Sequence, residues 1–374
     1  MQIAGGYVRS ERPPDIAAPP GPAAHAERRS TPFIPYIHSF RAVAIVAVVI
    51  SHVDFPFGRL TLGERLLLSV SRDASVLFLF IAGFLFQYLS TGFSYRRYLK
   101  SKLQNVILPY VIVSLPLLLH QYYRQFGPFA AASRRFGNPF LQGAWALLTA
   151  AQMPAPMWFI PMIACLYLAA PLLLAVDRHP RFYWTVVPLL VNAMFCHRPM
   201  PVNHIGQALV YFAPAYVIGM WFSRYQQRCT AFVEANLVTL FSIWAAAEVF
   251  SVVVLNRSGP IFGAAYSFER GVLDLNLPDK LLLSVCLVGV LSRYQSVIGH
   301  RLDYLAGASF GVFFVHGYVL NAAERRVAKV WDHGAPLGIS TAMVVVPICV
   351  LVSLGLVAAV RAVAGKRSRH IIGC

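Results

Sequence analysis

Charged residues are scarce in this chain. Only 13% of its 374 residues are Asp, Glu, Lys or Arg, whereas 57% are hydrophobic and the mean hydropathy is +0.60. An average soluble domain carries roughly 25% charged residues. The deficit excludes an ordinary soluble domain, and it predicts an all-α integral membrane protein that crosses the bilayer several times.

Cysteine and acidic residues are scarce as well. The six cysteines are scattered without a CxxC pair, so the sequence indicates neither a disulfide framework nor a zinc site, and no metal is expected. The 15 Asp and Glu against 32 Lys and Arg give a net charge of +17. In a membrane protein, basic cytoplasmic loops and contact with the anionic lipid bilayer explain this excess, so we expect no nucleic-acid partner.

The two ends of the chain lack apolar spans. Residues 1–32 are rich in Pro, Ala, Gly and Arg, and they lack the apolar central region that a signal peptide requires. We predict a disordered cytoplasmic tail at 1–32, a transmembrane domain at 33–361 and a basic cytoplasmic tail at 362–374. The basic clusters nearest to helix ends place both termini in the cytoplasm.

Long hydrophobic runs are what the chain has in abundance. Their lengths predict a bundle of about ten transmembrane helices. The runs cover residues 36–54, 74–89, 106–122, 157–176, 183–197, 206–222, 234–255, 279–292, 303–320 and 337–361.

The first run carries two polar residues on one helical face. Arg41 and His52 are eleven residues apart, which returns a helix to within about 20° of the same face after roughly 16 Å. An Arg inside a membrane costs roughly 2.5–3.5 kcal/mol and usually faces a partner or a wet cavity. The pair therefore indicates the wall of a polar passage. The alternative is that Arg41 reaches lipid headgroups and His52 meets water at the membrane surface.

Five short motifs follow one another in an order that is typical of one family. They are RAVAI with ISH at 41–52, VLFLFIAGFL at 76–85, LPY at 108–110, MWFIP at 157–161 and SFGVFFVH at 309–316. With these motifs the chain resembles the membrane acyltransferase 3 family, which contains bacterial O-acyltransferases that modify cell-surface polysaccharides, lipopolysaccharide and related glycans. The resemblance covers about 33–361.

The resemblance implies an acyl-CoA-dependent O-acyltransferase in the cytoplasmic (inner) membrane. It would move an acyl group, acetyl foremost, onto a sugar hydroxyl of a surface or exported polysaccharide or a lipid-linked glycan, with no permanently bound cofactor. A histidine has the pKa that a general base needs near neutral pH, which assigns His52 as the base or as a transient acyl acceptor. Arg41 is then the partner on the donor side.

A basic segment before the third span is expected to face the donor phosphates. The family commonly has two arginines three residues apart before its Pro-Tyr, but here Lys102 and Asn105 take those places. Asn105 carries no charge, so a strict two-arginine clamp is in doubt. Arg96, Arg97 and Lys100 are expected to join Lys102 as point charges.

Three further residues are weaker candidates for substrate binding. Ser309 and His316 share a helix face and would line the same cavity, or would form a hydrogen-bonded interior pair. Trp158 would be a substrate platform or a residue of the interfacial aromatic belt.

Two functions of other classes remain open. A transporter or exporter of a glycan or its precursor would use the polar passage to carry substrate and would not depend on CoA. A non-catalytic membrane scaffold would be unaffected by His52→Ala.

Overall fold

The computed structural model describes residues 33–53, 60–126, 135–150, 157–199, 205–260, 262–263, 273–330 and 339–374. The predicted tail at 1–32 lies outside the described residues. The segment Ile34–Cys374 forms one unit, and helices make up nearly all of its described secondary structure. The helical structure agrees with the fold class predicted from hydropathy, an all-α membrane protein.

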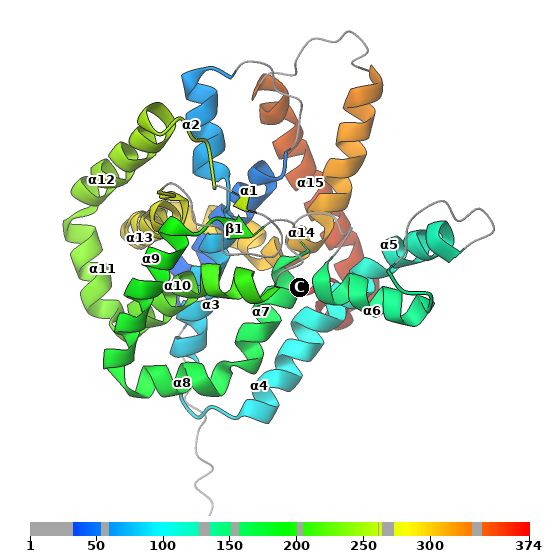
Figure 1. Cartoon of the computed structure of the whole chain (residues 1–374), viewed down its shortest axis with the longest axis horizontal. Coiled ribbons are helices and arrows are strands. Elements are labelled where there is room, and N and C mark those ends of the chain that lie inside the picture. The colour runs from blue at the N-terminus through cyan, green and yellow to red at the C-terminus, as the bar shows by residue number, and fades with distance from the viewer. Residues whose placement is uncertain are drawn as a thin grey trace, which may run out of the picture. The chain divides into compact units, whose positions relative to one another are not determined.

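The α-helices follow one another along the whole unit (Figure 1). Two short π-helical segments, Leu103–Ile107 and Phe250–Val254, continue α4 and α12, and 3₁₀ turns occupy Pro180–Thr185 and Gly365–Arg367. Two strands of two residues each, β1 (Arg198–Pro199) and β2 (Phe262–Gly263), pair in parallel. The α-helices are α1 (Pro35–Ser51), α2 (Leu62–Ser71), α3 (Ser75–Tyr88), α4 (Tyr95–Lys102), α5 (Leu108–Phe126), α6 (Pro139–Thr149), α7 (Phe159–Leu168), α8 (Ala170–Arg178), α9 (Val186–Phe195), α10 (Ile205–Arg224), α11 (Gln226–Ala235), α12 (Leu237–Val249), α13 (Asn276–Arg293), α14 (Gln295–Val330), α15 (Ile339–Ala364) and α16 (Ser368–Ile372).

Fewer helices are long and apolar enough to cross a membrane than hydropathy runs alone predict. Within the described residues there are six, or seven if α7 and α8, which meet at 58°, count as one broken span. The prediction of about ten spans is therefore not confirmed. The six cover Leu62–Tyr88, Tyr95–Phe126, Ile205–Arg224, Leu237–Val254, Gln295–Arg326 and Ala342–Ile372.

The difference arises where an apolar run is short or broken. The run at 183–197 becomes a 3₁₀ turn followed by the ten-residue helix α9. The run that contains Arg41 and His52 becomes α1, which has 17 residues and ends at Ser51. At 1.5 Å per residue α1 is about 25 Å long, short of the roughly 30 Å hydrocarbon core.

Helix α1 lies in the middle of the unit, with α5 and α6 toward one edge and α11 and α12 toward the other (Figure 1). It packs against α3, α13, α14 and α15. Side chains on several sides of it are buried, among them Phe40, Ala42 and Ile45. Because its neighbours are protein, α1 is apolar almost all round, and its polar residues meet side chains of other helices.

Helices α3 and α10 pack closely against each other. A Cβ atom added at Gly83 would collide with the carbonyl oxygen of Tyr216, and one at Gly219 would collide with that of Phe80. Small residues let helix backbones approach closely, which is the usual packing device inside membranes. The two glycines thus lock α3 against α10.

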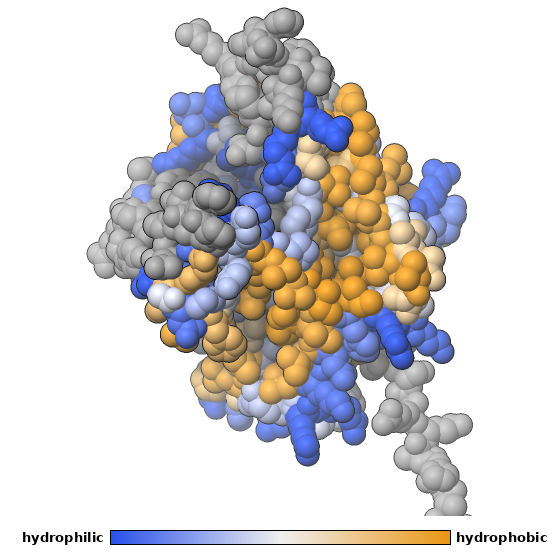
Figure 2. All heavy atoms as spheres, turned by 90° about the vertical axis from the view of Figure 1, so that its right-hand side faces the viewer, coloured by the Kyte–Doolittle hydropathy of each residue, from blue (hydrophilic) through white to orange (hydrophobic). Residues whose placement is uncertain are grey.

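Apolar side chains remain on the outer faces of the long helices. Leu119 on α5, Val238 on α12 and Leu351 on α15 are all more than 60% exposed. Figure 2 shows hydrophobic surface gathered across the middle of one face, with hydrophilic residues toward its upper and lower edges. A surface of this kind fits contact with lipid tails and headgroups.

The C-terminal segment 362–374, expected as a basic tail, carries ordered structure. Helix α15 continues to Ala364, and α16 packs against α5. Ile372 is buried, and the Nδ1 atom of His370 lies 3.1 Å from the carbonyl oxygen of Gln104. The last residues therefore form part of the helical unit.

Candidate active site

Two histidines from different helices meet at the end of α1. His52 follows directly after α1, and His316 lies within α14. Their ring centroids are 5.6 Å apart, in an edge-to-face arrangement. His316 is fully buried and His52 partly so. The structure thus brings together two residues that are 264 positions apart in the chain.

The backbone sets the tautomer of both rings. The Nδ1 atom of His52 lies 2.7 Å from the carbonyl oxygen of Val48, and Nδ1 of His316 lies 3.0 Å from that of Val312. A carbonyl can only accept a hydrogen bond, so each Nδ1 carries the proton and donates it. Each Nε2 is then left with a free lone pair, and Nε2 of His316 is buried without a hydrogen-bond partner. Both rings are oriented as proton acceptors.

At the other end of α1 a cavity of about 540 Å³ opens beside Arg41. Lys102 at the end of α4 and Arg369 on α16 line the same cavity. The Nζ atom of Lys102 sits over two aromatic rings, 5.2 Å from the centroid of Tyr98 and 4.8 Å from that of Tyr167. Among the residues that the structure describes, no carboxylate forms a salt bridge with any of the three cations. The cavity is suited to an anion.

Aromatic side chains connect this cavity to the histidines. Phe78, Phe159 and Phe310 line the cavity, and their ring centroids lie 6.3, 5.6 and 5.9 Å from that of Phe313. Phe313 in turn lies 6.2 Å from His316. The predicted polar passage is therefore polar only at its two ends, and its middle is aromatic.

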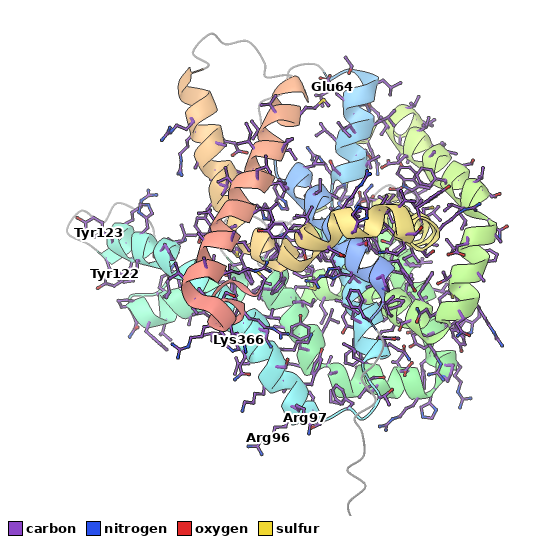
Figure 3. The ribbon with its side chains drawn as sticks, turned by 180° about the vertical axis from the view of Figure 1, so that it is seen from behind. Glu64, Arg96, Arg97, Tyr122, Tyr123 and Lys366 are labelled. Carbon is purple, nitrogen blue, oxygen red and sulfur yellow. The ribbon has the colours of Figure 1, made fainter. Side chains whose placement is uncertain are left out.

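The other basic residues of α4 lie elsewhere. Arg96 and Arg97 are exposed, and Figure 3 shows them pointing away from the helices at the free end of α4. Neither lines the cavity with Arg41. Lys100 lines a neighbouring apolar cavity of about 670 Å³, which shares Lys102 and Tyr167 with the first. Only Lys102 of the four predicted phosphate contacts therefore reaches the cavity beside Arg41.

Trp158 lies inside the protein. Its side chain is 9% exposed and stacks on Phe212, with ring centroids 5.4 Å apart. The guanidinium group of Arg198 lies over both rings, at 5.1 Å from Trp158 and 5.4 Å from Phe212. Arg198 also interacts electrostatically with His52. Trp158 thus belongs to the surroundings of the histidine pair, as a packed residue rather than a lipid-facing one.

Ser309 is fully buried on α14. Its hydroxyl donates to the carbonyl oxygen of Ala306, 2.8 Å away, within its own helix. It is not bonded to His316, which uses Val312 instead. The interior hydrogen-bonded pair considered from the sequence is therefore not formed.

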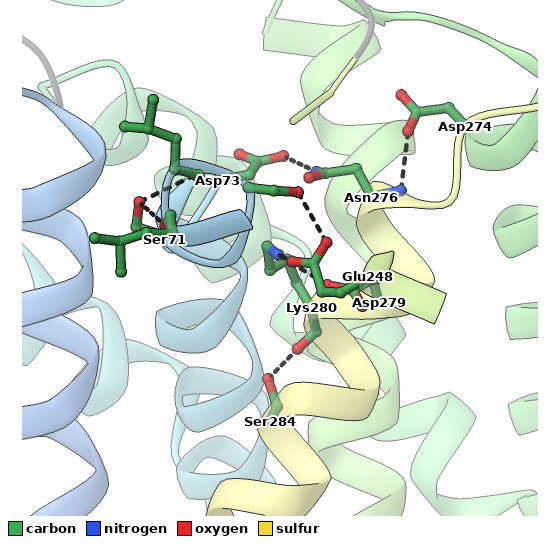
Figure 4. Close-up of polar contacts among 11 residues, drawn as sticks. Ser71, Asp73, Glu248, Asp274, Asn276, Asp279, Lys280 and Ser284 are labelled. Atoms are coloured by element: carbon green, nitrogen blue, oxygen red, sulfur yellow. Dashed lines mark hydrogen bonds and ion pairs between the residues drawn. The ribbon is translucent and has the colours of Figure 1, made fainter. Parts of the chain in front are cut away.

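Sequence reasoning missed a buried ionic network, and Figure 4 shows the part of it around Asp73 and Lys280. Asp73, at the bend between α2 and α3, forms a salt bridge of 3.2 Å with Arg198. The side-chain amide of Asn276 donates to the other oxygen of Asp73 at 3.0 Å. Asp274 accepts from the backbone N–H of Asn276 at 2.9 Å. These contacts fix Arg198 over Trp158.

A second part of the network surrounds Lys280, whose side chain is 1% exposed. Its Nζ atom lies 3.0 Å from Glu248 and 2.8 Å from Asp279. Ser69 donates to the remaining oxygen of Glu248 at 2.8 Å. The sequence does contain a signal for this cluster, because charged residues inside apolar runs such as 234–255 and 279–292 are uncommon and usually paired. Which residues pair with one another is decided by the fold.

No group of three or more His, Cys, Asp or Glu side chains with a metal-binding arrangement occurs in the described part of the chain.

Comparison with models of known families matches residues 34–360 to an acyltransferase domain of the acyltransferase 3 type. No curated protein and no solved structure matches the chain.

Proposed function

The chain belongs to the membrane acyltransferase 3 family, and on this premise we propose that it transfers an acyl group from acyl-CoA to a sugar hydroxyl. Acetyl is the acyl group that we propose first. The acceptor would be a cell-surface or exported polysaccharide, or a lipid-linked glycan. The single observation that carries this proposal is the histidine pair, whose Nε2 atoms are both available as proton acceptors.

His52 acts as the general base in this proposal. Its Nε2 removes the proton from the acceptor hydroxyl while the hydroxyl oxygen attacks the thioester carbonyl. A carbon–oxygen bond forms, the carbon–sulfur bond breaks, and the proton passes from His52 to the departing CoA thiolate. The products are a sugar ester and CoA. In an alternative order, Nε2 of His52 attacks the thioester first and the sugar then takes the acyl group from it.

The cavity at the start of α1 supports the donor side of the proposal. Arg41 and Lys102 supply positive charge for the phosphates of CoA. The helix rise places Arg41 and His52 roughly 16 Å apart, which is similar to the reach of an extended pantetheine arm. Phe78, Phe159 and Phe313 provide apolar walls along this route. The donor phosphates can thus stay near water while the thioester reaches the histidines.

The proposed donor site implies an orientation in the inner membrane. Acyl-CoA is cytosolic and too highly charged to cross lipid, so the end with Arg41 and Lys102 would face the cytoplasm. The end with His52 and Arg198 would face the periplasm, where an exported glycan can reach it. Both termini would then be cytoplasmic, in accord with the basic clusters.

The test is the ester content of the surface polysaccharide, measured by proton NMR before and after mild base. A deletion strain is complemented with wild type, His52→Ala, Arg41→Ala or His300→Ala. His300 is an exposed histidine of α14 and serves as the matched control. We expect wild type and His300→Ala to restore a base-labile acyl signal. His52→Ala should not restore it, because losing a general base slows the transfer by about 10²–10⁴-fold.

Two results would contradict the proposal. Full restoration of the signal by His52→Ala, at normal membrane levels, would remove His52 from the reaction and would leave the scaffold function open. An unchanged ester content together with a changed amount of exported polysaccharide would favour the transporter or exporter instead.

A further inference from the structure

The cavity beside Arg41 includes a residue from the very end of the described chain. Arg369 lies on α16 and lines this cavity together with Lys102. From the sequence alone, residues 362–374 were expected to be a basic tail outside the domain. Arg369 is exposed, as are the neighbouring Lys366 and Arg367, but of the three only Arg369 lines the cavity. Figure 3 shows Lys366 on the surface.

The position of Arg369 is held by several contacts around it. Ser368 is 5% exposed and Ile372 is 4% exposed, so the face of α16 that carries these two residues is packed against the protein. His370 contacts the carbonyl oxygen of Gln104 at 3.1 Å. This joins α16 to the π-helical segment Leu103–Ile107, which directly follows Lys102. Lys102 and Arg369 are therefore carried by two segments that contact each other.

The two cations line one cavity. Lys102 and Arg369 are close enough to interact electrostatically, and like charges repel. Within the described residues, no carboxylate is paired with either of them. Asn105 lines the same cavity, but its amide donates to the carbonyl oxygen of Ser101 at 2.7 Å and carries no charge. A bound phosphate would offset both charges.

We propose that Arg369 and Lys102 together bind a phosphate group of the acyl donor. Arg369 supplies a planar pair of N–H donors, Lys102 supplies a point charge, and Arg41 adds positive charge from α1. Position 105 holds an uncharged residue, so in this proposal the second cation comes from the C-terminal helix instead. The inference rests on the proposed function, because it takes acyl-CoA as the donor.

The test is CoA binding to the purified full-length protein in nanodiscs of neutral phosphatidylcholine, measured by isothermal titration calorimetry. We expect Arg369→Gln to raise the Kd for CoA by about 10- to 100-fold, the usual effect of losing a hydrogen bond to a charged group. Arg367→Gln is the matched control, since it removes the same charge two residues away on an exposed side chain. It should leave the Kd within about twofold. Thermal unfolding of both variants confirms that α16 remains folded.

The outcomes separate this inference from the proposed function. If wild type binds CoA and Arg369→Gln binds it equally well, the role of Arg369 is wrong while the donor remains acyl-CoA. If wild type does not bind CoA at all, the proposed donor itself is wrong, and this inference falls with it. If Arg367→Gln weakens CoA binding as much as Arg369→Gln does, the effect comes from the net charge of the segment, and the proposal is wrong.

Two further arms identify the phosphate and its source. Titration with 3′-dephospho-CoA shows which phosphate Arg369 contacts. If wild type and Arg369→Gln bind this ligand equally well, the contact is with the 3′-phosphate. If Arg369→Gln still binds it more weakly than wild type, the contact is with the diphosphate. Nanodiscs that contain phosphatidylglycerol test a lipid headgroup as the ligand. If Arg369→Gln reduces retention of phosphatidylglycerol and leaves CoA affinity unchanged, the cations serve lipid and the proposal is wrong.

Discussion

At the scale of single residues, the histidine pair is set by local backbone geometry. His52 and His316 each donate Nδ1–H to the carbonyl oxygen four residues earlier. This contact orients each ring and places its proton on Nδ1, so both imidazoles keep an unprotonated Nε2. With centroids 5.6 Å apart, the two rings can share the task of moving one proton.

The pair should therefore behave as one unit in kinetics. We expect His316→Ala to slow ester formation, and we expect the double variant His52→Ala/His316→Ala to be no slower than His52→Ala alone. Groups that act in one step are strongly non-additive. The measurement is CoA release from acetyl-CoA by membrane vesicles that contain the acceptor.

Control vesicles would carry His300→Ala, for which no loss is expected. If the losses of the two single variants multiply in the double variant, His316 acts independently of His52. It would then be a structural residue of α14.

At the scale of helices, the contact between α3 and α10 positions much of the site. Helix α3 carries Phe78, which lines the donor cavity, and α10 carries Phe212, on which Trp158 stacks. Gly83 and Gly219 allow the two helices to touch through their backbones. The site residues on both helices depend on this spacing.

Adding a methyl group at either glycine should separate the helices. We expect Gly83→Ala and Gly219→Ala to destabilise the protein by about 1–3 kcal/mol, the usual penalty of overpacking a close interface. The measurement is thermal unfolding in detergent, with membrane abundance as a second readout. The carbonyl groups of Tyr216 and Phe80 cannot move without displacing a helix.

Gly355→Ala on α15 provides the control, because a Cβ atom there would meet nothing within 4 Å. Alanine should be neutral or slightly stabilising at this helical position. Equal stability of all three variants would show that the α3–α10 contact tolerates a wider spacing.

At the scale of the whole molecule, the candidate spans differ in how far protein surrounds them. Leu237–Val254 is only 11% buried over its most apolar window, whereas Leu62–Tyr88 is 67% buried. The outer helices present leucine and valine to lipid, and α1 is surrounded by protein. The site is thus built on α1, a helix that looks like a membrane span by its hydropathy although protein surrounds it.

The arrangement predicts which residues share a side of the membrane. Arg96 and Lys366 lie toward one end of the helices and Glu64 lies at the other (Figure 3). In a cysteine-free background, we expect Arg96→Cys and Lys366→Cys to react with a membrane-impermeant maleimide only after permeabilisation. Glu64→Cys should react in intact spheroplasts, because Leu62–Tyr88 is a single span.

Labelling of all three positions from one side would contradict this topology. Labelling with the two sides exchanged would keep the span but reverse the proposed orientation, and would place the Arg41 cavity in the periplasm. Unmodified cysteine-free protein serves as the control for background reaction.

The sequence by itself determined the membrane class, the helical fold and the family, because composition and short motifs depend only on local residues. It also singled out Arg41, Lys102, His52 and His316, since charged or titratable side chains in apolar runs need a reason to be there. The roles proposed for these four remain predictions that the experiments above address.

Only the tertiary structure decided which of these residues meet. It joined His52 to His316, placed Arg369 beside Lys102, and paired Asp73 with Arg198. Within the part of the chain that it describes, it shows six or seven candidate spans and does not confirm the predicted ten. Hydropathy records how apolar a segment is, and it does not record whether lipid or protein surrounds that segment. Contacts between distant segments follow from packing, which no local pattern contains.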